Sequence, residues 1–143
     1  MKSILVVCEG NICRSPMAQG LLTAALPRIP VRSAGLNALS GTPADETAVR
    51  LMRARGIDIA PHRALQITRD LCAQAELVLV MSADQRKRLE ETYPFACGRV
   101  FRLGEFSKRD VPDPYRQSER AFGESLQLID EGVHEWLLRI QKI

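Results

Sequence analysis

The stretch 3-SILVVCEGNICRSP-16 decides the fold, because it combines a strand, a tight turn and the start of a helix. Residues 4–7 are consecutive apolar residues, which is typical of a strand buried on both faces. The dipeptide Gly10-Asn11 joins the two residue types that most readily adopt positive φ, as tight turns often require. Ser15 is a common N-cap residue and Pro16 suits the first helical position, so we expect a helix to begin there.

The turn in this stretch has the features of an anion-binding loop. A loop bent this tightly before a helix N-terminus directs backbone N–H groups into one concavity, which binds a tetrahedral oxyanion. Arg14 adds a planar guanidinium that can hold two phosphate oxygens at once, and the same field stabilises Cys8 as a nucleophilic thiolate. This pattern indicates phosphoryl transfer through a phosphocysteine. The alternative is a buried structural Cys8 with Arg14 as a surface charge.

The bulk composition bounds the possible functions. The chain has 143 residues and a formal net charge of +3, which predicts one domain over residues 1–143 and does not favour a nucleic-acid partner. No apolar run approaches the length of a membrane span, so we expect no membrane insertion. Four cysteines without an export signal indicate free thiols in a reducing compartment, and we expect a cytoplasmic enzyme.

Further strands and helices alternate along the rest of the chain. Continuous apolar strands between helices predict an α/β three-layer sandwich, with a central four-stranded parallel sheet (order 2-1-3-4) and helices on both faces. In such sheets the ligand lies beyond the carboxyl ends of the strands, where the loop after residue 7 begins. The expected later strands are 31–35, 77–81 and 100–103, and the expected helices are 16–26, 44–55, 68–75, 82–93 and 118–142.

A phosphocysteine mechanism also needs a group that protonates the leaving oxygen and later activates water. Asp113 is the best candidate, because Pro112 and Pro114 restrict the backbone on both sides of it. Tyr115 can line the mouth of the site and stack on an aromatic ring. Asp110 is the alternative acid, and the segment could also be a rigid structural turn.

Two segments, Cys8–Pro16 and Asp113–Tyr115, resemble those of the low-molecular-weight protein tyrosine phosphatases, and their order and spacing match across the chain. The resemblance implies that Cys8 is the nucleophile, Arg14 the transition-state clamp and Asp113 the general acid. It implies hydrolysis of phosphotyrosine in proteins, with no cofactor and no metal, because the loop supplies the positive field. The phosphate-binding residues would be Glu9, Gly10, Asn11, Ile12, Cys13, Arg14 and Ser15.

The same resemblance implies a network that holds the loop asparagine in an unusual conformation. Its members here are Asn11, Ser15, Ser33 and His62. Ser15 would also stabilise the thiolate, while the residues alone leave a catalytic-base role open for His62. Cys13 would form a reversible disulfide with the nucleophile and protect it from over-oxidation; the alternative is that it only packs under the loop.

The expected mouth of the site consists of Glu9, Leu39 and Tyr115. The carboxylate of Glu9 would disfavour acidic flanking sequences in a substrate. Arg116 stands where many eukaryotic members have a second tyrosine, so the mouth is less aromatic. This resembles the bacterial branch associated with exopolysaccharide or capsule production, and implies a membrane tyrosine autokinase as a possible phosphotyrosine partner of a monomeric enzyme.

Three alternatives share part of this pattern. Arsenate reductases of the same fold use further cysteines just after the third strand, but here none occurs between that strand and Cys97. Protein-arginine phosphatases have threonine where Ile12 stands, and isoleucine has no hydroxyl to orient water. A catalytically silent phosphotyrosine-binding module would need neither the thiol of Cys8 nor the acid Asp113.

Overall fold

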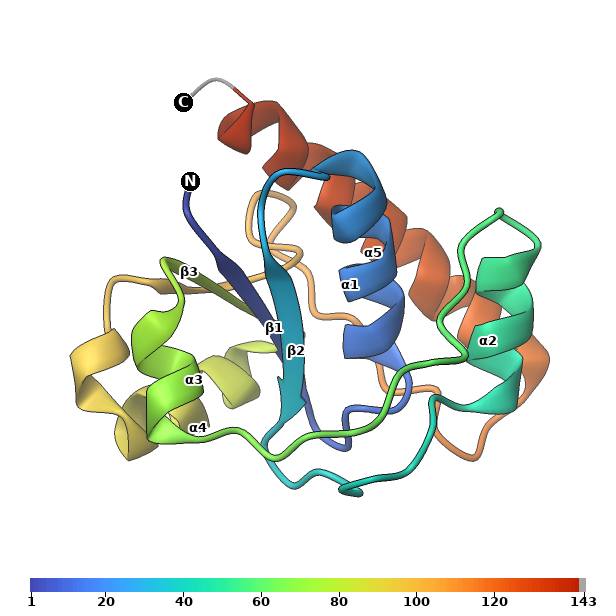
Figure 1. Ribbon diagram of the computed structural model, residues 1–143, viewed down its shortest axis with the longest axis horizontal. Coiled ribbons are helices and arrows are strands. Elements are labelled where there is room, and N and C mark those ends of the chain that lie inside the picture. The colour runs from blue at the N-terminus through green and yellow to red at the C-terminus, as the bar shows by residue number, and fades with distance from the viewer. Residues whose placement is uncertain (142–143) are drawn as a thin grey trace.

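Four short strands form one parallel sheet in the order β2-β1-β3-β4, which confirms the predicted topology. The computed structural model describes residues 1–141 (Figure 1). β1 lies at the centre, and its last residue, Cys8, is in register with Gly35 of β2. The elements are β1 (Ile4–Cys8), α1 (Arg14–Ala25), β2 (Val31–Gly35), α2 (Glu46–Arg53), α3 (Arg69–Gln74), β3 (Leu77–Val80), α4 (Ala83–Thr92), η1 (Pro94–Ala96), β4 (Val100–Arg102) and α5 (Glu119–Ile140).

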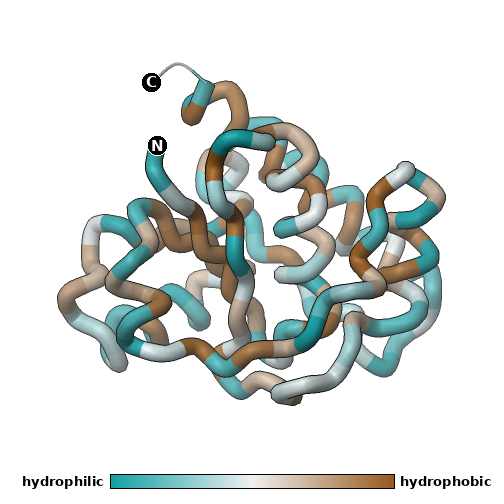
Figure 2. Tube along the Cα trace, viewed as in Figure 1, coloured by the Kyte–Doolittle hydropathy of each residue, from teal (hydrophilic) through white to brown (hydrophobic). Residues whose placement is uncertain are grey.

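Alternating side chains of the strands build a separate hydrophobic core on each face of the sheet. Val6 and Leu79 pack on the side of α1, α2 and α5. Val7 and Val80 pack on the other side, against α3 and α4. Figure 2 shows the hydrophobic residues concentrated along the central strands, with hydrophilic segments in the surrounding loops. The sheet is therefore buried on both faces, as continuous apolar strands predict.

Three of the expected helices begin with a hydroxyl cap. Thr68, Ser82 and Ser118 each accept a hydrogen bond from a backbone N–H in the first turn of α3, α4 and α5. The predicted first helical turn at Ala44 is wrong, because Asp45 caps α2 through the N–H of Thr47. The expected end of the last helix at Lys142 lies outside the described residues.

The predicted start of α1 is also wrong. α1 begins at Arg14, Cys13 occupies the cap position, and no side chain caps the helix. The hydroxyl of Ser15 is engaged with Asn11 and Cys8 instead, so it does not cap the helix. The first turn of α1 therefore belongs to the loop that it follows. None of the helices within residues 1–141 has the length and apolar character that a membrane crossing requires.

Candidate active site

The loop between β1 and α1 lies at the carboxyl end of the sheet. Asn11 is the one loop residue with positive φ (60°), whereas Gly10 has none, so the expectation for Gly10 is not met. The backbone N–H groups from Glu9 to Cys13 donate no hydrogen bond within residues 1–141. These donors stand directly before a helix N-terminus and are free to bind an anion.

A directed chain of hydrogen bonds reaches the sulfur of Cys8. The Nδ2 of Asn11 donates to the Oγ of Ser15 at 2.7 Å and to the Oγ of Ser33 at 3.0 Å. Because Ser15 accepts from Asn11, its own hydrogen is available for Cys8 Sγ, which lies 2.9 Å from the Ser15 Oγ. The chain therefore places a buried hydroxyl donor against the sulfur, where it can stabilise negative charge that develops on this atom during a reaction.

The other atoms of Asn11 are also held. Its Oδ1 accepts from the N–H of Leu65 at 2.8 Å, and its carbonyl oxygen lies 2.7 Å from Nε2 of His62. A carbonyl can only accept, so His62 carries its proton on Nε2. Burial lowers the pKa of His62, which favours the neutral ring. These contacts compensate the strained backbone of Asn11.

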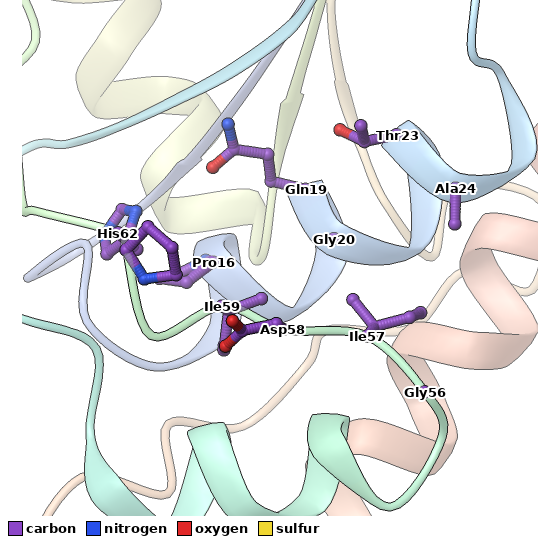
Figure 3. Close-up of a pocket in the computed structure, with 11 residues that line it drawn as sticks. Pro16, Gln19, Gly20, Thr23, Ala24, Gly56, Ile57, Asp58, Ile59 and His62 are labelled. Atoms are coloured by element: carbon purple, nitrogen blue, oxygen red, sulfur yellow. The ribbon is translucent and has the colours of Figure 1, made fainter.

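His62 lies behind the loop, away from the pocket that contains the sulfur. Figure 3 shows it beside Pro16 at the start of α1, at one end of a second cavity of about 450 Å³. His62 therefore contacts the network and not the pocket of Cys8, which fits the positioning role better than the catalytic-base role.

Arg14 is 5% exposed and extends into the pocket from the first residue of α1. Its Nη1 donates to the carbonyl oxygen of Val111 at 2.8 Å, and its Nη2 lies 3.5 Å from Oδ2 of Asp113. Its Nε is buried and has no hydrogen-bond partner within residues 1–141. A buried guanidinium with an unused donor is suited to hold an oxyanion.

Asp113 and Asp110 have different surroundings. Asp113 lines the pocket, its side chain is 44% exposed, and its Oδ1 accepts from the N–H of Tyr115 at 3.1 Å. Asp110 accepts from the N–H of Ala83 at 3.1 Å and from Arg102 at 3.2 Å. Asp110 is therefore committed to the start of α4 and to an ion pair, and only Asp113 reaches the pocket.

One cavity of about 180 Å³ brings most of the predicted site residues together. Leu39 and Tyr115 are exposed at its mouth, where an aromatic ring could lie between them. Of the predicted network, Asn11 and Ser15 lie beneath the cavity, fully buried. The lining residues are Cys8, Glu9, Gly10, Ile12, Cys13, Arg14, Asn37, Leu39, Asp113 and Tyr115.

Cys13 lines the same cavity but differs from Cys8 in its surroundings. Burial, together with the carboxylate of Asp45, raises the pKa of the Cys13 thiol well above its usual range. Cys13 is therefore a protonated thiol in the resting protein. Of the side chains in the loop, only that of Cys8 is both a sulfur nucleophile and in contact with a hydroxyl donor.

Sequence reasoning missed several residues that position the site. Gln19 accepts from Ser33 at 2.7 Å and donates to the carbonyl of Val31, so it extends the network by one link. Arg88 forms a paired hydrogen bond with Glu9 from the distant helix α4. Neither residue stands in a motif, and both contacts depend on the fold.

Comparison with known proteins places these features in context. The family low molecular weight phosphotyrosine protein phosphatase matches residues 3–143. The probable low molecular weight protein-tyrosine-phosphatase EpsP of Ralstonia nicotianae is 51% identical, over 100% of this chain and 99% of that protein. A structure of Vibrio vulnificus Wzb in complex with benzylphosphonate has a TM-score of 0.93 and 40% identity, covering 96% of this chain and 98% of that one. The YwlE arginine phosphatase from Geobacillus stearothermophilus has a TM-score of 0.93 and 30% identity, covering 99% and 94%.

Proposed function

The chain belongs to the low molecular weight phosphotyrosine protein phosphatase family, and on that premise we propose how its residues hydrolyse phosphotyrosine. The protein is a protein-tyrosine-phosphatase, which is a phosphoric monoester hydrolase. One observation supports the residue roles more than any other. Cys8, Arg14 and Asp113 come from two distant segments and line one small cavity beside unused donors.

In the first step, the Sγ of Cys8 attacks phosphorus and the bond from phosphorus to the tyrosine oxygen breaks. Asp113, in its protonated form, gives its proton to the departing oxygen. The loop N–H groups and the guanidinium of Arg14 hold the three non-bridging oxygens, over which the charge is spread in the transition state. The product of this step is a phosphocysteine and a free tyrosine side chain.

In the second step, water attacks the phosphocysteine while Asp113 accepts a proton from that water. The bond from phosphorus to sulfur breaks, inorganic phosphate leaves, and the electron pair returns to Cys8. The hydroxyl of Ser15, 2.9 Å from the sulfur, stabilises the leaving thiolate. Arg14 serves both steps, because its Nη1 bond to Val111 fixes the guanidinium in one orientation.

The walls of the cavity favour an aromatic phosphate ester as the substrate. Leu39 and Tyr115 provide apolar and aromatic surface at the mouth, which suits a phenyl ring. Ile12 lines the cavity with a side chain that offers no hydroxyl, so we prefer phosphotyrosine to phosphoarginine as the substrate. We further propose a membrane tyrosine autokinase of an exopolysaccharide or capsule pathway as a partner in the cytoplasm, where the free cysteines would stay reduced.

A panel of phosphopeptides tests this function. The same peptide is prepared with phosphotyrosine, phosphoserine or phosphoarginine, and phosphate release is measured for each. We expect phosphotyrosine to give a kcat/KM at least about 100-fold above the others. The reason is that the mouth of the pocket can stack on a phenyl ring, which phosphoserine and phosphoarginine lack. Faster release from phosphoarginine would instead support the arginine-phosphatase alternative.

A further inference from the structure

Glu9 is the one acidic residue in the phosphate loop, residues 8–15. It follows the nucleophile directly, and it is one of the residues that line the cavity of Cys8. A carboxylate at this place opposes the chemistry of the site, because it repels both a thiolate and a phosphate dianion. An anion site that contains such a residue needs a compensating positive charge.

Arg88 of α4 supplies this charge. Its Nη1 and Nη2 donate to Oε1 and Oε2 of Glu9 at 2.8 and 3.0 Å, so the contact is bidentate. Hydrogen bonding to Glu9 raises the pKa of Arg88, which keeps the guanidinium charged. Asp84, one turn earlier on α4, lies 3.7 Å from the same Nη1. Arg88 packs on the opposite face of the sheet from α1 and reaches the loop across the carboxyl edge.

The backbone of Glu9 is fixed separately from its side chain. Its carbonyl oxygen accepts from the N–H of Asn37 at 2.9 Å. A Cβ at Gly35 would lie 2.7 Å from that oxygen, so the end of β2 packs directly against it. The loop therefore has its own anchor, and the ion pair is not needed to hold the peptide of Glu9 in place.

The ion pair is also too exposed to contribute much to folding. The side chains of Arg88 and Glu9 are 42% and 39% exposed, and ion pairs at such sites contribute little to stability. Its effect on the charge of the cavity is larger. With the pair intact, Arg14 lies beside Asp113, and Arg88 lies beside Glu9 and the more exposed Asp84. Without Arg88, the carboxylate of Glu9 has no guanidinium partner, and Arg14 is left as the guanidinium that faces Asp113 and Glu9.

We propose that Arg88 is a positioning residue for substrate binding, which acts by pairing with Glu9 and cancelling the charge of the one carboxylate on the phosphate loop. This inference rests on the proposed function, because it takes the loop as the phosphate site. The consequence is a cavity that keeps its attraction for a phosphate dianion although a glutamate follows the nucleophile.

Three variants test the proposal, with p-nitrophenyl phosphate as the probe. Arg88→Ala should raise KM by roughly 5- to 20-fold and change kcat little, as expected for a dianion on the order of 10 Å from one uncompensated carboxylate. The increase should shrink in about 1 M salt, where screening acts over about 3 Å. Glu9→Gln combined with Arg88→Ala should restore KM to within about twofold of the wild type. Glu9→Gln alone removes the carboxylate and leaves the guanidinium of Arg88 uncompensated by Glu9, so KM should fall below the wild-type value.

Two further variants separate charge from structure. Lys87→Ala removes one positive charge from the same helix, and Lys87 is exposed with no ion pair within residues 1–141, so its KM should stay near the wild-type value. Arg88→Lys keeps the charge and should raise KM by less than about threefold. Arg88→Lys also tests the proposal if Arg88→Ala does not fold. A lysine keeps the positive charge but cannot form the bidentate contact, so a large KM increase in this variant would show that the contact geometry matters and the charge alone does not suffice.

Several results would overturn the proposal. An unchanged KM in Arg88→Ala would remove the role of the charge, and a double variant no better than Arg88→Ala would assign the pair a mechanical role. An equal KM increase in Lys87→Ala would indicate a general field effect. If the wild type itself releases no phosphate, the proposed function fails; if it is active and Arg88→Ala matches it, only this inference fails.

Discussion

Replacing Ser15 with alanine tests the hydrogen-bond chain that ends at the nucleophile. Ser15→Ala removes the hydroxyl that lies 2.9 Å from Cys8 Sγ in a fully buried position. A hydrogen bond to a charged group contributes about 1.5–3 kcal/mol, which corresponds to a rate change of roughly 10- to 150-fold. The full loss should fall on the second step, in which the sulfur leaves with its electron pair.

The expected result is a change in the rate-limiting step. Hydrolysis of the phosphocysteine should become slow, so the intermediate accumulates and stopped-flow measurements with p-nitrophenyl phosphate should show a burst of p-nitrophenolate. Ser33→Ala is the matched control, because Ser33 also accepts from Asn11 Nδ2 but is bonded to Gln19 and not to Cys8. If Ser15→Ala turns over without a burst, and its kcat lies within about threefold of the Ser33→Ala value, the reasoning is refuted.

Three other outcomes follow from the site. Asp113→Asn should lower kcat by roughly 10²- to 10⁴-fold for phenyl phosphate, and by less for leaving groups that need no proton; an equal loss in a steady-state series would contradict its role as acid. Burial lowers the pKa of His62, so on acidification the unfolded chain takes up a proton before the folded chain does, and the free energy of unfolding should decrease as pH falls below about 6.5. In urea unfolding, His62→Gln should show a smaller decrease than the wild type. If the free energies of the two proteins fall in parallel, this linkage is wrong. Peroxide should inactivate the wild type reversibly, since a Cys8 sulfenic acid can condense with the Cys13 thiol to a disulfide and water; equal recovery of Cys13→Ser with added thiol would exclude this protection.

The fold could be predicted from the sequence because its signals are local. The apolar run at residues 4–7 predicts a buried central strand, and Thr68, Ser82 and Ser118 mark helix starts by their hydroxyl groups. The start of α1 could not be predicted in this way. Ser15 has the residue type of a cap, but its hydroxyl bonds to Cys8 and Asn11 in three dimensions.

In the candidate site, too, residues with a local signal could be predicted and contacts between distant segments could not. The loop residues and Asp113 could be identified from their types, because an anion loop needs glycine, asparagine and arginine in close succession. The partners of these residues could not. The carbonyl of Val111 that orients Arg14 is 97 residues away from it, and Arg88 is 79 residues from Glu9. The repulsion of acidic flanking sequences that we expected from Glu9 should also be weaker, since the guanidinium of Arg88 pairs with its carboxylate.

The central claim is that the sulfur of Cys8, in a loop shaped for an oxyanion, takes the phosphate covalently. The most direct test is rapid acid quench of the wild type and of Ser15→Ala during turnover of an aryl phosphate, followed by mass spectrometry of the peptides. We predict phosphate on Cys8, with a larger fraction in Ser15→Ala. Steady turnover with no phosphate on Cys8 in either protein would contradict the claim.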